Sequence, residues 1–296
     1  VIDFLGKKKI FFILSAVVII AGFVTMGVHK GNGGDALNYS LEFKGGTSTS
    51  VEFNEDMSIE ELDEKVVPII EEISKDANVQ TQKVQGSNQV IFKSATLDVS
   101  QREELNSRLE EEFGVDPEKI TAETISSTIS SEMRTGAVSA VVVSTVLMLL
   151  YVWFRFKDVR FGASSVAALV HDVLVVLAFY AAARVSVGNT FIACMLTIVG
   201  YSINATIVIF DRIRENMTSY KTKEELAAIV NRSISQTLSR SIFTSLTTFI
   251  MVAVLYILGV SSIKEFALPL MVGIACGTYS SICLASAFWY LLRTRV

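Results

Sequence analysis

Six apolar runs, each long enough to cross a membrane, constrain this chain more than any other feature of its sequence. A spanning helix needs about 20 mostly apolar residues. The mean hydropathy of +0.47 is too high for an ordinary soluble protein of 296 residues. We therefore predict a polytopic membrane protein with six transmembrane helices. The runs are Ile10–Val28, Gly136–Phe154, Phe161–Ala183, Val187–Phe210, Ser241–Val260 and Phe266–Leu292.

The first run is not expected to be a secretory signal. It is longer than a typical signal core, and no small-residue cleavage site ends it cleanly. The chain begins at Val1 and not at Met, which is consistent with a start trimmed ahead of Val1. We therefore expect the first run to remain in the protein as a spanning helix.

Lys and Arg fall mainly on one side of the six runs. The short loops on the other side hold little more than Arg184 and Lys264. Because cytoplasmic loops carry an excess of Lys and Arg, both termini and the loop 211–240 are predicted to be cytoplasmic. The segment 29–135 then lies outside, and it is acidic, with 22 Asp and Glu against 10 Lys and Arg. This charge distribution needs no nucleic-acid partner.

The segment 29–135 has the pattern of a small α+β domain. Two glycines, Gly45 and Gly46, separate two segments that alternate like strands, and capping boxes at Ser58 and Ser100 predict the starts of two helices. The resulting order, a hairpin followed by αββαβ, favours a ferredoxin-like domain. The predicted strands are 38–43, 47–53, 79–85, 89–93 and 119–125, with a turn at residues 86–88.

The predicted organisation has three parts. Residues 1–28 form the cytoplasmic N-terminus and the first span, and residues 29–135 form the extracytoplasmic domain. Residues 136–296 form a bundle of five spans that includes the cytoplasmic loop 211–240. Within that loop, the amphipathic segment 222–238 is expected to lie along the inner membrane surface.

No pattern in the sequence indicates an enzyme, a cofactor or a metal site. The usual hydrolase, zinc-peptidase and nucleotide-binding motifs are missing. His171 and Asp172 are adjacent, so their side chains should point about 100° apart on a helix, which suits neither a shared metal nor a base with its orienting group. The cysteines are expected to be small core residues without metal-site spacing: Cys194, Cys276 and Cys283.

Polar residues inside the runs are the candidates for function. Ionisable residues are expensive in a membrane and normally face a partner, water or the bundle interior. His171 and Asp172 are either a hydrogen-bonded pair that fixes helix packing or part of a proton-linked site. Hydroxyl groups at helix interfaces are common packing devices, and Gly273 with Gly277 permits close helix approach. The further polar candidates are Tyr201, Asn204, Thr206, Arg240 and Thr244.

Several separated motifs resemble those of the SecD/SecF family of bacterial protein-export proteins. The strongest is GYSIN at 200–204, followed by the helix-end motif Asp211, Arg212, Arg214, Glu215 and Asn216. The segment 43–47, with Gly45 and Gly46, resembles the family's FxGGT motif. Further resemblances are found at 168–172, 231–241 and 244–248.

The resemblance implies a function in protein export. A SecF-like chain has six spans and pairs with a SecD-like half to form a bundle similar to the RND transporters. The pair is expected in the bacterial cell membrane, beside the SecYEG channel, where it acts on the unfolded polypeptide that the SecA motor has pushed in. It would use the proton motive force, and the polar candidates above would then belong to a proton relay within the lipid bilayer.

One position departs from the family pattern. Many members carry Asp where this chain has Ala205, and that carboxylate is implicated in proton movement. Asp172 could supply the missing carboxylate, the SecD-like half could carry it, or the chain could be a scaffold that binds polypeptide without coupling. Arg240 could set the charge state of a nearby carboxylate, because a cation within about 4–6 Å favours the charged form. A less favoured alternative is half of an RND-type small-molecule exporter.

Overall fold

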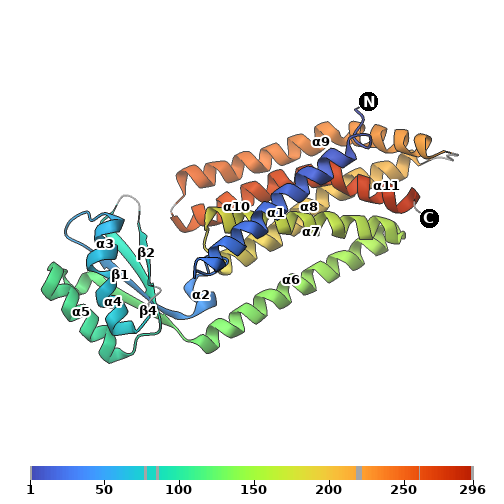
Figure 1. Ribbon diagram of the computed structural model, residues 1–296. Helices are drawn as coiled ribbons and strands as arrows, with labels where there is room; N and C mark the ends of the chain where they lie inside the picture. The colour runs from blue at the N-terminus through green and yellow to red at the C-terminus, as the bar shows by residue number, and fades with distance from the viewer. Residues whose placement is uncertain (1, 77–78, 85–86, 218–221, 260, 295–296) are drawn as a thin grey trace. The chain divides into compact units, whose positions relative to one another are not determined.

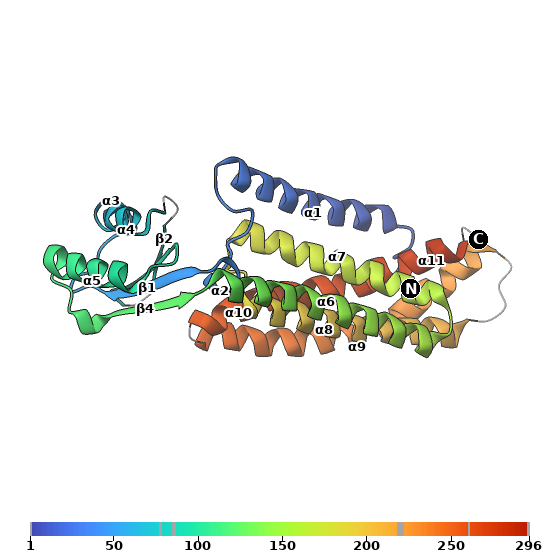
Figure 2. The same ribbon diagram turned by 90° about the horizontal axis from the view of Figure 1, so that it is seen from below.

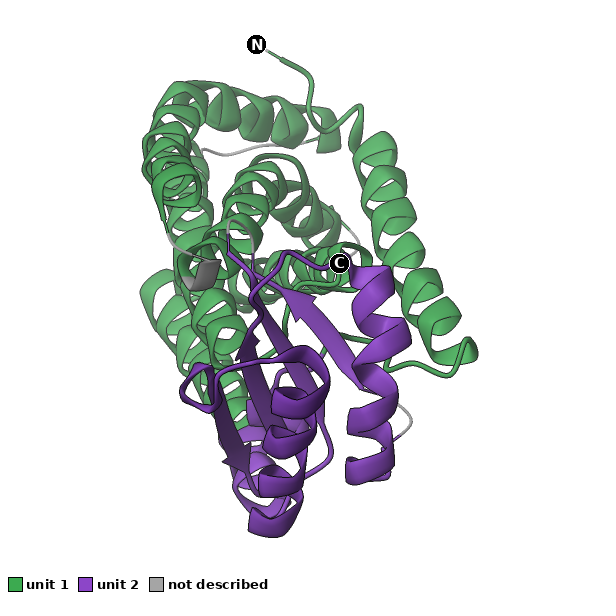
Figure 3. Cartoon of the chain, turned by 90° about the vertical axis from the view of Figure 1, so that its left-hand side faces the viewer, with its two compact units in different colours: residues 1–38, 137–296 green, residues 39–136 purple. Residues whose placement is uncertain are grey.

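A computed structural model of the chain describes residues 2–76, 79–84, 87–217, 222–259 and 261–294. The chain divides into two compact units (Figure 3). Residues 39–136 form one unit, called here the α/β domain. Residues 1–38 and 137–296 form the other, called here the helical unit. Gln85 and Gly86, which belong to a predicted strand and turn, lie outside the described residues.

The α/β domain contains one antiparallel sheet with helices packed on it (Figure 1). The strand order is β2-β3-β1-β4. The chain order is βαββαβ, which together with this sheet order is the ferredoxin-like arrangement that the sequence predicted. The elements are α2 (Leu41–Lys44), β1 (Gly46–Glu52), α3 (Ile59–Lys65), α4 (Val67–Ser74), β2 (Gln80–Lys83), β3 (Gln89–Ser94), α5 (Val99–Phe113), η1 (Pro117–Lys119) and β4 (Ile120–Ile125).

The core of this domain lies between the sheet and its helices. Val51 on β1 and Phe92 on β3 are fully buried, and they pack in one cluster with Leu62, Leu105 and Leu109 from the helices. Alternate strand residues face the helices because side chains alternate between the two faces of a strand. The domain therefore has an independent hydrophobic core.

The predicted strand at 38–43 is wrong. Residues 41–44 form the short helix α2, which ends at Gly45 with φ of +76°. Gly46 has φ of +123°, and a Cβ atom there would overlap the carbonyl oxygen of Ser94 on β3. The two glycines thus lead from a helix directly into β1, in a backbone conformation that other residues rarely adopt. They are not the turn of a hairpin.

The helix starts were predicted with mixed success. The capping box at Ser58 is confirmed, because its side chain accepts from the backbone N–H of Glu61. The second box begins two residues earlier than predicted, at Asp98, which accepts from the backbone N–H of Gln101. The single helix expected after Ser58 divides at Val66 into α3 and α4, where Pro68 starts a new helix.

The cap of α5 predicts a local sensitivity to acid. Hydrogen bonds from the Gln101 backbone and the Ser100 hydroxyl lower the pKa of Asp98 below its usual value. A carboxylate with a depressed folded-state pKa adds stability above its unfolded pKa, and this is lost as the pH falls through the folded pKa. We expect the protection of the first-turn amides of α5, relative to the intrinsic exchange rate at each pH, to fall below about pH 4.

The substitution Asp98→Asn separates this effect from general acid unfolding. Asparagine is a comparable N-cap but does not titrate. The loss of protection in α5 should therefore disappear in this variant, while protection at the Ser58 cap, where the pKa of Glu61 is lowered, should still fall in acid. Equal acid sensitivity of α5 in the parent and the variant would contradict the prediction.

In the described residues, the structure has the six predicted spans: Lys8–Gly31, Ser127–Phe156, Val159–Ala183, Asn189–Asn216, Lys223–Leu258 and Ile263–Thr294. The first five are helices α1, α6, α7, α8 and α9. The sixth is built from α10 (Ser261–Tyr279), the π-helical turn η2 (Ser280–Ala285) and α11 (Ser286–Thr294). The last span, α7 and α8 are the most buried, whereas α1 and α6 expose most of their apolar side chains.

The segment expected to lie along the membrane surface is continuous, in one helix, with the fifth candidate span. Helix α9 runs without interruption from Lys223 to Leu258. No Gly or Pro occurs in this range to end the helix. Its first turns bury Leu226, Val230 and Ile234 in the core of the helical unit.

Small residues let the helices of this unit approach closely. Helix α1 lies beside α7 (Figure 2), where a Cβ atom at Gly22 would be 2.6 Å from the Cα of Ala178. A Cβ at Gly273 of α10 would overlap the side chain of Ile198 on α8, and one at Gly277 would lie 3.1 Å from the Cβ of Ser202. Gly273 and Gly277 therefore lie where α10 closely approaches α8.

Candidate functional site

Asp172 is fully buried in the helical unit and is surrounded by polar groups from three helices. The hydroxyls of Ser202 and Ser280 donate to its Oδ2 at 2.5 and 2.7 Å. The thiol of Cys276 donates to Oδ1 at 3.3 Å, and Nδ1 of His171 lies 3.0 Å from the same oxygen. We call these five residues the Asp172 cluster.

Local structure explains how the cluster assembles. Gly277 lets α10 approach α8 at Ser202, so that Cys276 and Ser202 reach the same carboxylate. Ser280 is the first residue of η2, where the helix changes to π-helical winding. Such turns are rare and are frequently found at functional sites. The cluster therefore depends on a close helix contact and on an irregular helix.

Further hydroxyl groups extend the polar region on two sides. Ser281 lies 2.9 Å from the hydroxyl of Thr206 and donates to the carbonyl of Ser202 at 3.2 Å. Tyr279 donates to the carbonyl of Phe11 on α1, and its ring centroid lies 6.1 Å from that of His171. Polar groups thus continue from α1 past the Asp172 cluster to α8.

The Asp172 cluster contains a carboxylate without a permanent cation. Among the described residues, no Lys or Arg contacts Asp172, and its only basic neighbour is His171. The interior is neutral when Asp172 carries a proton or when His171 does, and an unpaired charge at this depth is costly. The Nε2 atom of His171 is also buried, without a hydrogen-bond partner in the described part of the chain. The arrangement thus places one acidic and one basic group within hydrogen-bond distance, without a Lys or Arg contact among the described residues.

Most of the other predicted candidates line a separate small cavity of about 70 Å³. Arg240, Asn204 and Thr244 are exposed there in the isolated chain. The hydroxyls of Tyr201 and Ser241 are buried without a partner among the described residues. The lining residues, none of which has a carboxylate, are Tyr201, Asn204, Ala205, Val208, Arg240, Ser241, Thr244 and Ser245.

The structure therefore divides the predicted candidates into two groups. Thr206, on the buried side of α8, contacts the hydroxyl of Ser281, which donates to the backbone carbonyl of Ser202, a member of the Asp172 cluster. Asn204 lies on the exposed side of the same helix. Arg240 is not among the contacts of Asp172, so the suggested pairing of Arg240 with a carboxylate is not formed within the described residues.

The motif at 211–216 forms the end of α8 and ties it to two other helices. Asp211 accepts from Arg155 of α6 at 2.8 Å. Arg212 donates to Gln236 of α9 at 2.7 Å. Three more contacts complete the group: Asn216 with Ser233 at 2.9 Å, Glu215 with Arg212 at 2.7 Å and Arg214 with Asp211 at 3.7 Å. This motif is thus a structural junction between helices.

Sequence reasoning missed three residues of the Asp172 cluster. Ser202 lies inside the GYSIN motif, and its position 30 residues after Asp172 gave no sign that the two meet. Cys276 was read as a small core residue, and Ser280 was not singled out. Cys276 follows Gly273 by three residues in the small-residue segment, which is the one signal that it lies near a helix contact.

Comparison with protein families places the chain among export proteins. The model of the family "Protein export membrane protein SecD/SecF, C-terminal" matches residues 105–295. The chain is 36% identical over 288 residues to protein translocase subunit SecF of Sebaldella termitidis, covering 97% of this chain and 90% of that protein. It is 34% identical to protein translocase subunit SecF of Petrotoga mobilis, covering 96% of this chain and 94% of that one.

Longer proteins contain a similar region. Protein translocase subunit SecDF of Bacillus subtilis is 34% identical over 99% of this chain, which spans 38% of its length. A crystal structure of SecDF from Thermus thermophilus, described as a translocon-associated membrane protein, is similar with a TM-score of 0.81 and 35% identity. That match covers 99% of this chain and 39% of the SecDF chain.

Proposed function

This chain belongs to the SecD/SecF family of protein export membrane proteins, and we propose that it is the SecF-type subunit of a Sec translocase. In this function it assists the export of proteins across the cell membrane, together with a SecD-like partner. The similarity to SecDF proteins supports the partner, because this chain corresponds to less than half of those chains. Export would draw on the proton motive force.

The observation that carries the coupling is the burial of Asp172 among groups that can exchange a proton with it. A carboxyl group in a spanning helix that faces other helices is the kind of residue found in proton relays. Asp172 has His171 on one oxygen and two hydroxyl donors on the other. Asp172 would bind and release the proton. Because the hydroxyls of Ser202 and Ser280 donate to its carboxylate, a change in its charge would change the contacts of α7 with α8 and η2.

If this chain carries a proton relay, Ala205 leaves Asp172 as the carboxylate that would serve it. Ala205 lines the cavity that also holds Arg240, and a methyl group cannot carry a proton. Asp172 is the one fully buried Asp or Glu in the described part of the chain. In this proposal Asp172 takes the function of the carboxylate that many relatives carry at position 205.

The proposed location is the bacterial cell membrane, with both termini in the cytoplasm. The distribution of Lys and Arg supports this orientation, since these residues cluster near the ends and in the segment 211–240. The acidic α/β domain would then lie outside. The SecYEG channel, and through it the emerging unfolded polypeptide, are the further proposed partners.

A second function is a scaffold that binds its partners and the polypeptide without moving protons. Two observations favour it. First, Ala205 leaves the small cavity beside Arg240 without a carboxylate. Second, both oxygens of Asp172 accept hydrogen bonds that also hold three helices together. The two functions differ in whether protons cross the membrane when a polypeptide is exported.

Reconstitution separates the two functions. Proteoliposomes would hold this chain, its SecD-like partner, SecYEG and SecA, with a pH-sensitive dye to follow proton uptake. We expect completion of export to be faster with a proton gradient than after an ionophore has collapsed it, and proton uptake to accompany export. Vesicles without this chain are the control for gradient effects on the channel itself.

If this chain speeds export equally with and without the gradient, and no proton uptake is seen, the coupled function is wrong and the scaffold is supported. If the chain has no effect on export in either condition, the assignment to export itself is wrong.

A further inference from the structure

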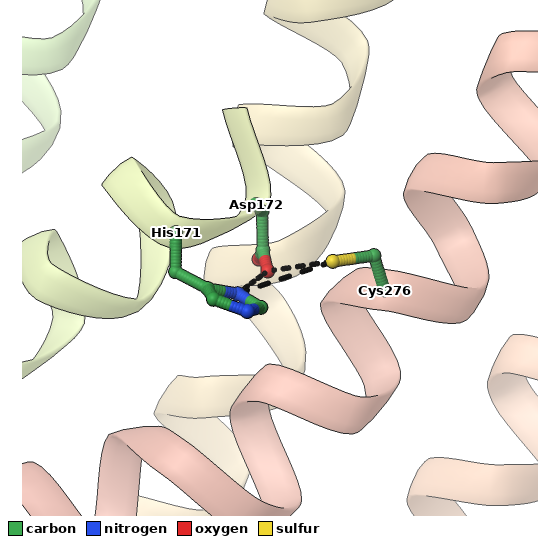
Figure 4. A group of neighbouring side chains, drawn as sticks. All are labelled: His171, Asp172 and Cys276. Carbon is green, nitrogen blue, oxygen red and sulfur yellow. Dashed lines mark hydrogen bonds and ion pairs between the residues drawn. The ribbon is translucent and has the colours of Figure 1, made fainter. Parts of the chain in front are cut away.

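Three side chains of the Asp172 cluster carry atoms that bind transition metals. Nδ1 or Nε2 of His171, a carboxylate oxygen of Asp172 and Sγ of Cys276 lie within 4.8 Å of one another. Figure 4 shows the three side chains pointing toward one another, two from α7 and one from α10. Imidazole, carboxylate and thiolate are all ligands that zinc accepts in proteins.

We propose that His171, Asp172 and Cys276 form a binding site for a divalent transition metal of the zinc type. The separations of the ligand atoms are 3.0 Å between His171 Nδ1 and Asp172 Oδ1, 3.3 Å between Oδ1 and Cys276 Sγ, and 3.9 Å between Sγ and Nδ1. Zinc bonds of about 2.0–2.3 Å at tetrahedral angles place ligand atoms roughly 3.3–3.6 Å apart. Shifts of a few tenths of an ångström therefore suffice to place an ion between them.

The charges of these groups suit a buried divalent ion. One carboxylate, one thiolate and one neutral imidazole balance a charge of two, so the occupied site is neutral overall. Neutrality matters because an uncompensated charge inside a membrane bundle is expensive. On binding, the thiol proton of Cys276 and any proton on Asp172 leave for the solvent.

The remaining contacts of Asp172 resemble the support that metal sites usually have. Hydrogen bonds from Ser202 and Ser280 hold Oδ2, so that Oδ1 is directed toward His171 and Cys276. Groups that fix a ligand in this way commonly raise metal affinity. The thiolate selects zinc-like ions over magnesium and calcium, which prefer oxygen ligands. A water molecule can take the fourth tetrahedral position.

The sequence predicted that the adjacent His171 and Asp172 would not share a metal, but the structure places Nδ1 of His171 3.0 Å from Oδ1 of Asp172. The third ligand comes from a distant helix and is not evident from the sequence. Cys276 lies 104 residues after Asp172, and it reaches the cluster through the close contact of α10 with α8 at Gly277. The proposal goes beyond export and does not depend on it. In an exporting complex, a bound ion would occupy the proton site at Asp172 and would stop proton uptake there.

Cobalt is the probe for the first experiment, because Co²⁺ replaces zinc and has visible absorption bands. The purified full chain in detergent micelles would be titrated with Co²⁺. We expect one equivalent to produce the near-ultraviolet charge-transfer band of a cobalt–thiolate bond, and Zn²⁺ to abolish it. The substitution Cys276→Ser should remove this band, whereas the matched variant Cys283→Ser should keep it.

A second variant tests the carboxylate. Asp172→Asn should weaken Co²⁺ binding by at least about tenfold. Added metal should raise the melting temperature of the parent and of Cys283→Ser more than that of Asp172→Asn or Cys276→Ser. A ligand that binds only the folded state raises its stability. Circular dichroism would confirm that each variant keeps its helices. No thiolate band in the parent, or an unchanged band in Cys276→Ser, would overturn the proposal.

Discussion

Replacing Asp172 with asparagine is expected to remove the proton-driven part of export and to leave the chain folded. The amide has nearly the same shape, and its oxygen can still accept from a serine hydroxyl, but it cannot carry the proton. The rate of export with a gradient should fall to the rate measured after the gradient is collapsed. Proton uptake by the same proteoliposomes should fall to background.

The variant will also be somewhat less stable. Asp172 accepts from the hydroxyls of Ser202 and Ser280 and from the thiol of Cys276, and the new NH₂ group must face some of these donors. Misplaced buried donors cost about 1–3 kcal/mol. The decrease in stability should be visible in a thermal melt, yet it should be too small to unfold the bundle.

Asp158→Asn is the matched control for this prediction. Asp158 is the N-cap of the same helix, α7, and accepts from the backbone N–H of Arg160. Asparagine is a comparable cap, so export and its gradient dependence should be unchanged. If Asp172→Asn retains gradient-driven export, the relay runs through another residue, and the scaffold function of this chain gains support.

Replacing Gly22 with leucine is expected to push α1 away from α7. A Cβ atom at Gly22 would lie only 2.6 Å from the backbone Cα of Ala178, and a backbone atom cannot move aside as a flexible side chain can. Overpacking of this kind costs about 1–3 kcal/mol and sometimes more. For a bundle of this size we expect the melting temperature in detergent to fall by roughly 5–10 °C.

Gly27→Leu is the matched control, because this residue lies on the same helix and a Cβ there meets open space. It should change the melting temperature little. The displacement in Gly22→Leu should also separate Ser15 from Tyr279, whose hydroxyls are 3.3 Å apart. A short bifunctional thiol reagent should join cysteines introduced at these two positions in the parent and in Gly27→Leu, but far less in Gly22→Leu, because a direct disulfide needs closer Cα atoms. Equal crosslinking in all three would contradict the predicted displacement.

The spans and the domain type could be predicted from sequence because both follow from local patterns. Length and apolarity alone define a spanning helix, and the order of elements defined the ferredoxin-like domain. The errors arose where the same local pattern allows two structures. Residues 41–44 alternate like a strand, yet the positive φ angles of Gly45 and Gly46 end a short helix there.

The candidate site was only half predictable. His171 and Asp172 could be found because ionisable residues inside an apolar run are conspicuous. Their partners could not, because Ser202, Cys276 and Ser280 are ordinary small residues in their own helices. Whether such residues meet depends on which helices are neighbours and on how each is rotated. The period of one helix holds no information on either point.

The π-helical turn η2 sets the rotational phase between the two parts of the last span. Ser280 donates to Asp172, and Trp289, nine residues later, stacks on Phe161, so both contact α7. In an uninterrupted α-helix nine residues make about two and a half turns, and the two side chains would point in opposite directions. The wider winding of η2 removes roughly 100° of that rotation.

This phase shift makes the length of the turn critical. Deleting one residue from η2 would restore ordinary α-helical winding and turn one part of the span against the other. Either Trp289 would leave the aromatic stack or Ser280 would leave the carboxylate. A helical wheel drawn through residues 263–294 with one constant angle therefore assigns the wrong face to half of the span.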